Sequence, residues 1–514
     1  MGRGWPMNLR NAAREAVARI RTFRERRDGA VAIQMAFMVV PMSVLTFGAI
    51  DVANGMAVKT RLQDALDSAA LAAARSTAYT DAGLQDIGED VLAANMTGSP
   101  GTISSSSFTA DGTKVVASAK VKLKPVIANL WLQGDMVIGA KSEINRKVNK
   151  IELALVLDNT GSMKGDKLSN LQTASKNLID TLAAASARST EVDAVKIAIA
   201  PFSMTVRVGA DYRTATWMDQ TGASPINNEI FSSAANRFTL LDQMGVAWGG
   251  CVEARQAPYD VQDTAPDEAT PATLFTPFFA PDEPSSNGYY NSYLPDVTSS
   301  NNWKTRQGYV PKYNQAPTKT GINSNTGYEW GPNAGCALAP ISRLSTDWES
   351  LKTAVDGMKA VGDTNIPLGL MWGWHLLSPN APFADGRAYG TPKSTKIVVL
   401  MTDGDNTMGS TSNNNASLYN GLGYIWQNRL GITSGTTSQR REAMDGRLAT
   451  LCANMKAQGI VIYTVRVEVT SGSSTVLQNC ASSADKFYDV QDAADLDSVF
   501  NAIAGEIENL RILK

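Results

Sequence analysis

Residues 30–50 form a run without a single charged side chain, AVAIQMAFMVVPMSVLTFGAI. At about 1.5 Å per residue, a helix of about 20 residues crosses a hydrocarbon core of about 30 Å. Buried helices of soluble proteins are rarely so long and so free of charge, and a proline such as Pro41 is tolerated in a membrane-spanning helix. The run therefore predicts a transmembrane helix that separates residues 1–29 from the rest of the chain.

The segment before this run is rich in arginine. Residues 1–29 contain eight arginines against Glu15, Glu25 and Asp28. The positive-inside rule keeps such a segment in the cytoplasm. We therefore expect a single-pass protein of a bacterial inner membrane, with its C-terminal part in the periplasm. A cleavable signal peptide is the alternative, but no clear Ala-x-Ala site closes the run and the chain continues as a helix.

The helical pattern continues beyond the apolar run. Apolar residues recur at helical spacing from Val58 to Ala73, and charged residues occupy the remaining positions. The two segments together predict one helix of over 40 residues, about 65–70 Å long. Residues 77–149 show no strong helical pattern. Residues 113–123 and 136–144 alternate in part, so we expect a small antiparallel sheet there.

A second strong constraint lies in the stretch Leu155–Met163, LVLDNTGSM. An apolar run ends in the carboxylate of Asp158, and the hydroxyls of Thr160 and Ser162 follow at two-residue steps. These residues put one anionic and two neutral oxygens on one loop at the end of a buried strand. Such a set suits a hard divalent cation, Mg²⁺ first, with Ca²⁺ or Mn²⁺ as alternatives. A bound metal would also account for a buried carboxylate that is costly without a partner.

Two later segments have the same character. Thr364 lies in a glycine-containing loop just before Pro367, which suits the first turn of a helix. Lys396–Gly404 reads as a buried β-branched strand that ends in Asp403. The strands before the two aspartates are hydrophobic, as a parallel sheet covered on both faces requires. The alternative is that these are ordinary turn residues that cap strands and helices.

The pattern Asp-x-Thr-x-Ser resembles the first metal-binding loop of von Willebrand factor A domains, with Thr160 where serine is usual. Thr364 and Asp403 follow in the order of that family's second and third loops. The resemblance implies a doubly wound, parallel α/β sheet over residues 150–514. It also implies a divalent cation with an open coordination position, held by Asp158, Thr160, Ser162, Thr364 and Asp403.

The rest of this region alternates between helix and strand as such a sheet demands. The expected helices are 166–187, 347–361, 366–377, 439–458 and 495–510, and the expected strands, besides the one before Asp158, are 195–202, 395–402 and 460–467.

Residues 29–76 resemble the N-terminal segment of TadG-like proteins of Tad/Flp pilus assembly, and more broadly a type IV pilin stem. The resemblance implies a pilin-like stem and small β region at residues 51–149, and a role in the assembly, anchoring or surface adhesion of Flp-type pili. Prepilins are cut after a glycine such as Gly29, with a glutamate five positions later. Here that position is Gln34, which cannot neutralise an ammonium group. Cleavage after Gly29 and a retained anchor both stay open, as does incorporation into a pilus.

The composition argues against several other classes of function. A net charge of -2 lacks the basic face of a nucleic-acid binder. The single histidine, His375, lies in an apolar helical segment and is expected in the core. Zinc sites with two or three histidines are therefore excluded, and a Ser-His-Asp triad would have to include His375, with no serine placed near it. We expect a protein that is not an enzyme.

Four cysteines allow three disulfide pairings. The sequential one, Cys251–Cys336 with Cys452–Cys480, is the economical choice. A periplasmic location would permit both bridges.

Residues 205–345 are too long for one connection of this fold, so we expect an insertion. Its many tyrosines and tryptophans argue against disorder. Cys251 and Cys336 could close its base. We expect it to lie beside the metal loops and to contribute partner specificity, and the alternative is a covering without a role of its own.

The expected function is metal-dependent protein binding, in which a partner's acidic residue completes the coordination of the cation. Two alternatives remain. In one, the domain binds through its loops as an envelope scaffold and the metal is only a structural brace. In the other, it is a metal-assisted hydrolase of the cell envelope, although no base or nucleophile can be named for it.

Overall fold

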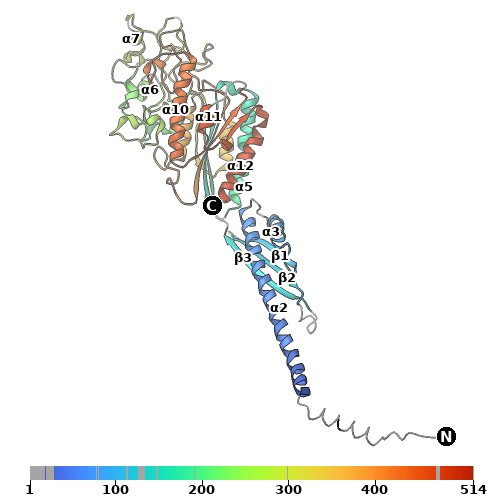
Figure 1. Cartoon of the computed structure of the whole chain (residues 1–514). Coiled ribbons are helices and arrows are strands. Elements are labelled where there is room, and N and C mark those ends of the chain that lie inside the picture. Colours follow the sequence, from blue (N-terminus) through green and yellow to red (C-terminus); the bar gives the residue numbers. More distant parts are fainter. Residues whose placement is uncertain are drawn as a thin grey trace, which may run out of the picture. The chain divides into compact units, whose positions relative to one another are not determined.

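The computed structural model describes residues 18, 28–76, 78, 80–111, 114–125, 134–145, 149–189, 191–286, 288–297, 299–469 and 475–512. The chain divides into two compact units, Met1–Arg146 and Lys147–Lys514 (Figure 1). Most of the basic segment before residue 28 lies outside the described residues.

The first unit is built on one long helix, α2, which runs from Asp28 to Arg75. This confirms the predicted helix of over 40 residues. Its first half exposes many apolar side chains, among them Phe37 and Leu45. Its second half buries a stripe that begins at Val58 and Leu62. Within the described residues, α2 is the helix whose length and composition would allow it to cross a membrane.

A second helix, α3, spans Asp81–Met96, so the expectation that residues 77–149 lack a strong helix was wrong. The Thr80 side chain caps the helix by accepting a hydrogen bond from the Gly83 amide at 3.1 Å. One position of the buried face is Gly88, where a Cβ atom would lie 2.4 Å from the Phe108 ring. A glycine in the buried stripe removes the apolar signal on which the periodicity depends.

The three strands of this unit form an antiparallel sheet in the order β1-β2-β3. Their bounds are β1 Thr102–Asp111, β2 Lys114–Leu123 and β3 Met136–Asn145. The predicted sheet is thus confirmed. Strand β1 was not predicted, because its serine-rich sequence carries few apolar residues.

The second unit contains a six-stranded sheet in the order β11-β10-β9-β4-β5-β8. All neighbours are parallel except β5 and β8, which are antiparallel at one edge. The expected doubly wound α/β sheet of the von Willebrand A type is therefore confirmed, with one antiparallel edge strand. Its strands are β4 Lys150–Asp158, β5 Val195–Phe202, β8 Ser342–Ser345, β9 Ser394–Thr402, β10 Val461–Val467 and β11 Phe487–Val490.

Helices cover both faces of this sheet. Leu153 and Leu155 of β4 face a core shared with α5 Asp166–Ala187, α8 Trp348–Asp356 and α12 Leu496–Ile512. Ala154 and Val156 face the opposite core, which contains α9 Ile366–Leu377 and α10 Thr437–Ala457. The predicted helices are present, although α8 ends before Gly357 instead of reaching residue 361. The short elements β8, β11 and α11 Thr475–Cys480 were not predicted, since four to six residues show no clear period.

Helix α9 packs unusually close to the sheet through two glycines. A Cβ atom at Gly369 would lie 2.3 Å from Phe202, and one at Gly373 would lie 2.3 Å from Val156. Because both glycines lie four residues apart, they form one face of the helix. This close approach positions the loop that precedes α9.

Apart from β8, which belongs to the sheet, the described residues of the region 205–345 form an insertion whose regular elements are short. They are β6 Val206–Arg207, α6 Arg237–Gln243, β7 Cys251–Val252 and α7 Trp303–Gln307, joined by 3-10 turns. The disulfides have the sequential pairing, Cys251–Cys336 and Cys452–Cys480. The first bridge joins two positions of the insertion that are 85 residues apart, with a Cα–Cα distance of 5.8 Å.

Candidate metal centre

The two aspartates predicted as ligands lie at the ends of neighbouring strands. Asp158 is the last residue of β4, and Asp403 directly follows β9. Strands β4 and β9 are parallel neighbours, so their carboxyl ends lie at the same edge of the sheet. The fold thereby brings together two residues that are far apart in the sequence.

A chain of hydrogen bonds joins four of the five predicted ligands. The Thr160 amide donates to Asp158 Oδ1 at 2.8 Å, and the Thr160 and Ser162 hydroxyl oxygens are 3.0 Å apart. The Ser162 hydroxyl donates to Asp403 Oδ1 at 2.7 Å. The Thr402 hydroxyl donates to Asp158 Oδ2 at 2.6 Å, which sequence reasoning did not anticipate. Carboxylate and hydroxyl oxygens thus converge in one place.

Thr364 lies on the adjoining loop and does not join this chain of hydrogen bonds. That loop is tied to the first by the Gly161 amide, which donates to the Gly362 carbonyl at 2.9 Å, and by the Val361 amide, which donates to the Asn159 carbonyl at 2.8 Å. Thr364 itself is buried, and its backbone forms two hydrogen bonds with Thr407. The structure therefore places Thr364 next to the site but records no direct contact with the other four residues.

The site concentrates negative charge in a buried place. The Asp158 side chain is fully buried, and this burial raises its pKa to about 6. The charge of Asp403 is the second cause of this raised pKa, and the hydrogen bonds from Thr160 and Thr402 oppose the shift. A cation beside both carboxylates would stabilise their ionised forms.

The residues present fit a small divalent cation. Among the described residues, no three His, Cys, Asp or Glu side chains form a metal cluster, so the candidate set combines two carboxylates with neutral hydroxyls. The Asn159 side-chain amide and the Ser203 hydroxyl are buried beside these loops and have no hydrogen-bond partner in the described part of the chain. A hydrated hard cation supplies water molecules that such groups can bind.

Two charged residues at this edge were missed by the sequence analysis. Lys167, in the first turn of α5, places Nζ 2.9 Å from Asp403 Oδ2 and 3.5 Å from Glu468 Oε2. Glu468 directly follows β10, the strand next to β9. Its position after a parallel strand was the available signal, because residues there collect at the same edge of the sheet.

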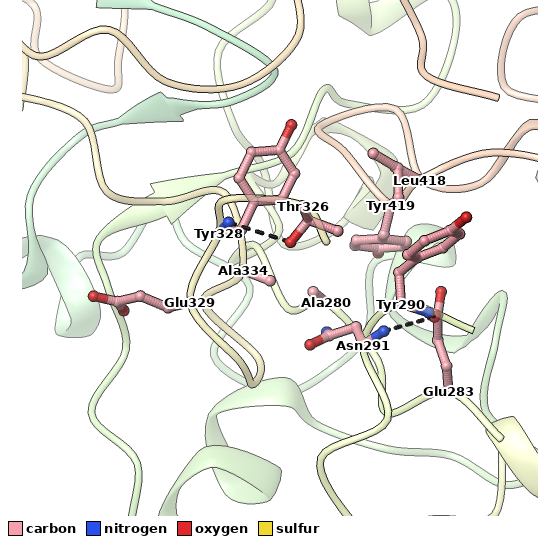
Figure 2. Close-up of a pocket in the computed structure, with 10 residues that line it drawn as sticks. All are labelled: Ala280, Glu283, Tyr290, Asn291, Thr326, Tyr328, Glu329, Ala334, Leu418 and Tyr419. Carbon is pink, nitrogen blue, oxygen red and sulfur yellow. Dashed lines mark hydrogen bonds between the residues drawn. The ribbon is translucent and has the colours of Figure 1, made fainter. Parts of the chain in front are cut away.

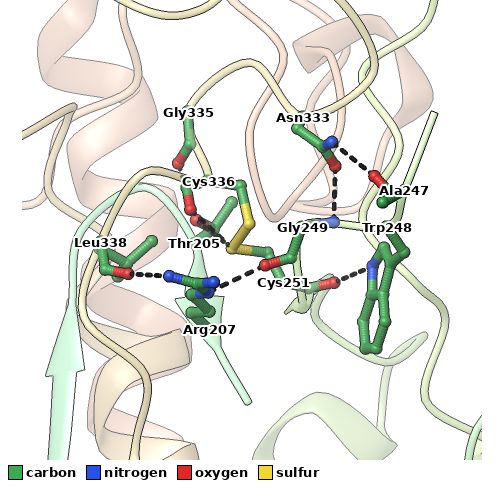
Figure 3. Close-up of a disulfide and its surroundings, with 10 residues drawn as sticks. All are labelled: Thr205, Arg207, Ala247, Trp248, Gly249, Cys251, Asn333, Gly335, Cys336 and Leu338. Atoms are coloured by element: carbon green, nitrogen blue, oxygen red, sulfur yellow. Dashed lines mark hydrogen bonds between the residues drawn. A yellow bond between two sulfur atoms is a disulfide. The ribbon is translucent and has the colours of Figure 1, made fainter. Parts of the chain in front are cut away.

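The insertion meets the second metal loop at its base. The Thr205 hydroxyl donates to the Gly335 carbonyl at 3.0 Å, next to the Cys251–Cys336 bridge (Figure 3). Met204 lies against both Gly335 and Gly362, with Sδ or Cγ about 3 Å from the position of a Cβ atom. The base of the insertion is therefore adjacent to the loop that carries Thr364.

A small pocket lies between the insertion and the loop after β9 (Figure 2). Tyr290, Asn291 and Tyr328 line it from the insertion, and Leu418 and Tyr419 line it from that loop. The Asn291 amide donates to Glu283 Oε2 at 2.8 Å on its wall. The charge of Asp363, one residue before Thr364, contributes to a raised pKa of Tyr328, although burial is the larger cause.

His375 lies in the core, as predicted, and belongs to a polar cluster away from these loops. Its Nδ1 is 3.6 Å from Asp263 Oδ1, and the Ser378 hydroxyl donates to Asp263 Oδ2 at 2.7 Å. A serine therefore does lie near the histidine, but it donates to the carboxylate instead of the imidazole. The His375 and Ser378 side chains are fully buried. This arrangement does not activate a nucleophile.

The comparisons with known proteins agree with the N-terminal expectation. Residues 29–76 match the family described as Flp pilus-assembly TadE/G-like. No curated protein matches the chain.

Several solved structures of pilus proteins are similar to the chain at a low level. The von Willebrand factor domain of the type V pili tip protein Mfa5 from Porphyromonas gingivalis has 10% identity and a TM-score of 0.34, over 71% of this chain and 97% of that one. The PilB minor pilin from Streptococcus sanguinis has 11% identity and a TM-score of 0.32, over 80% and 79%. The pilus adhesin SpaC from Lactobacillus rhamnosus GG has 11% identity and a TM-score of 0.32, over 79% of this chain and 34% of that one.

These similarities are too weak to bear on function, and the assignment of the fold rests on the strand order and direction described above. The chain therefore carries a TadE/G-like Flp pilus-assembly segment at residues 29–76, followed by a C-terminal unit with the fold of a von Willebrand A domain.

Proposed function

We propose that the C-terminal unit binds a protein partner through a divalent cation, as a component of a Flp-type pilus system. The observation that carries this proposal is the hydrogen-bonded set of Asp158, Thr160, Ser162 and Asp403 at the ends of β4 and β9. The buried carboxylate of Asp158, whose pKa is raised by burial, needs a cation to stay ionised at low cost.

In this proposal, Asp158 and Asp403 supply the charge and Thr160, Ser162 and Thr364 supply neutral oxygens for Mg²⁺, Ca²⁺ or Mn²⁺. The bound ion would present an open position to an acidic side chain of the partner. The chain's own part is to hold these oxygens on rigid strand ends and to keep the ion near the surface. Ser162 is exposed, so the site is accessible from that side. This role needs no catalytic step.

The helix α2 would anchor the protein in the bacterial inner membrane, with the C-terminal unit in the periplasm. The exposed apolar side chains on its first half support the membrane anchor, and the two disulfides agree with an oxidising compartment. A reporter fused at the C-terminus and active only in the periplasm tests the orientation. Activity of a cytoplasm-specific reporter at that position would contradict it.

The decisive experiment compares Asp158→Ala with Asp405→Ala, with pilus assembly and partner capture scored together. Asp405 lies on the same edge, but its half-exposed carboxylate pairs with Arg441 outside the ligand set. We expect capture to fail for Asp158→Ala and for the wild type in chelator, and to persist for Asp405→Ala. Normal capture by Asp158→Ala at normal protein level would overturn the proposal.

A structural brace is the second candidate, because the site joins the first loop to the second and its ligands Asp158 and Thr160 are buried. In that case chelation would lower the melting temperature and leave partner affinity per folded molecule unchanged. Measuring both quantities on the same sample separates the two roles.

A further inference from the structure

Lys167 is a cation that the protein itself supplies to the candidate metal centre. Its Nζ lies between two carboxylates, 2.9 Å from Asp403 Oδ2 and 3.5 Å from Glu468 Oε2. The Asp403 side chain is fully buried, whereas the side chains of Lys167 and Glu468 are 25% and 33% exposed. The shorter contact is therefore made to Asp403, the carboxylate for which an unpaired charge would be more costly because it is buried.

Both oxygens of Asp403 are occupied, but by groups of different kinds. Oδ1 accepts the Ser162 hydroxyl and Oδ2 accepts the Lys167 ammonium. A hydroxyl can turn its proton away and offer its oxygen to a cation. An ammonium group has three donors and no acceptor, so it repels a cation and must move before one can bind at Oδ2.

Glu468 offers a place to which the ammonium can move. Its Oε1 is held by the Ala493 amide at 3.0 Å, and its Oε2 is the atom that faces Lys167. The long, flexible stem of a lysine permits a shift between two nearby acceptors. The pKa of Lys167 is raised, because Asp403 and Glu468 together outweigh the opposing effect of its partial burial.

We propose that Lys167 is a resident counter-cation that a divalent ion displaces from Asp403 onto Glu468. This inference rests on the proposed metal-binding function and adds a residue that sets the affinity of the site. The lysine keeps Asp403 paired when metal is scarce, and it lowers the affinity for metal because its contact with Asp403 must be lost. Glu468 makes that exchange easier.

The test is calorimetric titration of chelator-treated, detergent-solubilised full-length protein with MgCl₂, with MnCl₂ and with CaCl₂. We expect Lys167→Met to lower the dissociation constant for the metal about tenfold, and Glu468→Gln to raise it about threefold. In the Lys167→Met background, Glu468→Gln should have no further effect. Lys176→Met is the control, because Lys176 lies on the same helix as Lys167 and forms an ion pair at 2.6 Å with the more exposed Asp356 of α8. It should bind metal as the wild type does.

A second measurement separates this role from general damage to the fold. In chelator, Lys167→Met should melt below the wild type, because Asp403 is left buried without a cation. In saturating Mg²⁺ the two melting temperatures should coincide. If Lys167→Met does not fold without metal, Lys167→Gln keeps a donor to Asp403 and should tighten binding by a smaller factor.

The outcomes distinguish this inference from the proposed function. Suppose that the wild type binds Mg²⁺ and that Asp158→Ala abolishes this binding. If Lys167→Met then leaves the dissociation constant unchanged or raises it, the proposed displacement is wrong and the metal site stands. If neither the wild type nor Lys167→Met binds Mg²⁺, Mn²⁺ or Ca²⁺, both proposals are overturned.

Discussion

The sheet of the C-terminal unit and its insertion are stabilised in different ways. The strands β4, β5 and β9 bury aliphatic side chains on both faces and satisfy their backbone groups in the sheet. The insertion has little regular backbone pairing, and it buries charged side chains instead. Glu253 accepts hydrogen bonds from Arg237, Arg429 and Tyr419, and all four side chains are buried or nearly so.

In the insertion, buried charged side chains form hydrogen bonds with backbone groups, which in the sheet are paired between strands. Lys312 donates to the carbonyls of Asp282 and Arg306 and pairs with the Asp282 carboxylate at 2.7 Å. One carboxylate oxygen of Asp282 in turn accepts the amides of Tyr293 and Leu294. Side chains thus satisfy polar groups of this buried, irregular backbone. We expect the insertion to be the more sensitive region to loss of a single charge or crosslink.

The largest effect is expected from removal of the Cys251–Cys336 bridge. The two residues are 85 positions apart, so on the chain-entropy model the double serine variant should lose about 4–5 kcal/mol of unfolding free energy. Removal of Cys452–Cys480, with a separation of 28, should cost about 3–4 kcal/mol. Denaturant unfolding of the two variants gives the comparison. A larger loss for the second bridge would contradict it.

The next largest loss of unfolding free energy is expected from Glu253→Gln. The substitution removes the negative charge that Arg237 and Arg429 share, and only Arg429 keeps another carboxylate partner, Glu229. Breaking such a buried pair costs about 3–5 kcal/mol. Hydrogen exchange should show the loss in the insertion before the sheet. Glu349→Gln is the control, because its ion pair with Lys352 is on the surface, and it should leave stability unchanged. Equal effects of the two variants would remove the distinction between the regions.

His375 tests the contact between the two regions, since it lies on α9 and faces Asp263 of the insertion. Burial lowers its pKa from 6.5 to about 4. The unfolded chain therefore takes up a proton near pH 6.5 that the folded chain refuses until about pH 4, so acid favours unfolding. Between these values the wild type should lose about 3 kcal/mol more than His375→Gln. Tryptophan fluorescence in urea at several pH values measures this, and parallel pH curves would contradict it.

The smallest effect is expected in the sheet region, from Gly373→Ala. The added methyl group would lie 2.3 Å from Val156, and such overpacking costs about 1–3 kcal/mol. Gly446→Ala on α10 is the matched control, because nothing lies within 4 Å of the new Cβ atom. That variant should be neutral or slightly stabilised. A neutral Gly373→Ala would show that α9 can move away from the sheet.

The same difference explains how much the sequence could predict. Runs such as Leu153–Leu157 and Ile397–Met401 have the length and composition of buried parallel strands, so the sheet and the meeting of Asp158 with Asp403 were predictable. The partners of Glu253 come from positions far apart in the chain and follow no period. Lys167, in the first turn of α5, resembles any surface charge in the sequence, whereas Glu468 could have been noticed only from its position directly after β10. Helix α3 was missed because Gly88 takes the place of an apolar residue.

The closed base of the insertion has a consequence for evolution and engineering. The ends of the segment between Cys251 and Cys336 are fixed by one covalent bond at a Cα–Cα distance of 5.8 Å, so a replacement segment has to return to within that distance. Arg429 and Tyr424 contact the insertion from the loop after β9, so this loop must be exchanged with it. Asp263 of the same segment faces His375 of α9, so this helix would have to be matched to any replacement as well. The bridge thus fixes where the segment begins and ends, whereas its buried contacts fix which neighbours have to change together with it.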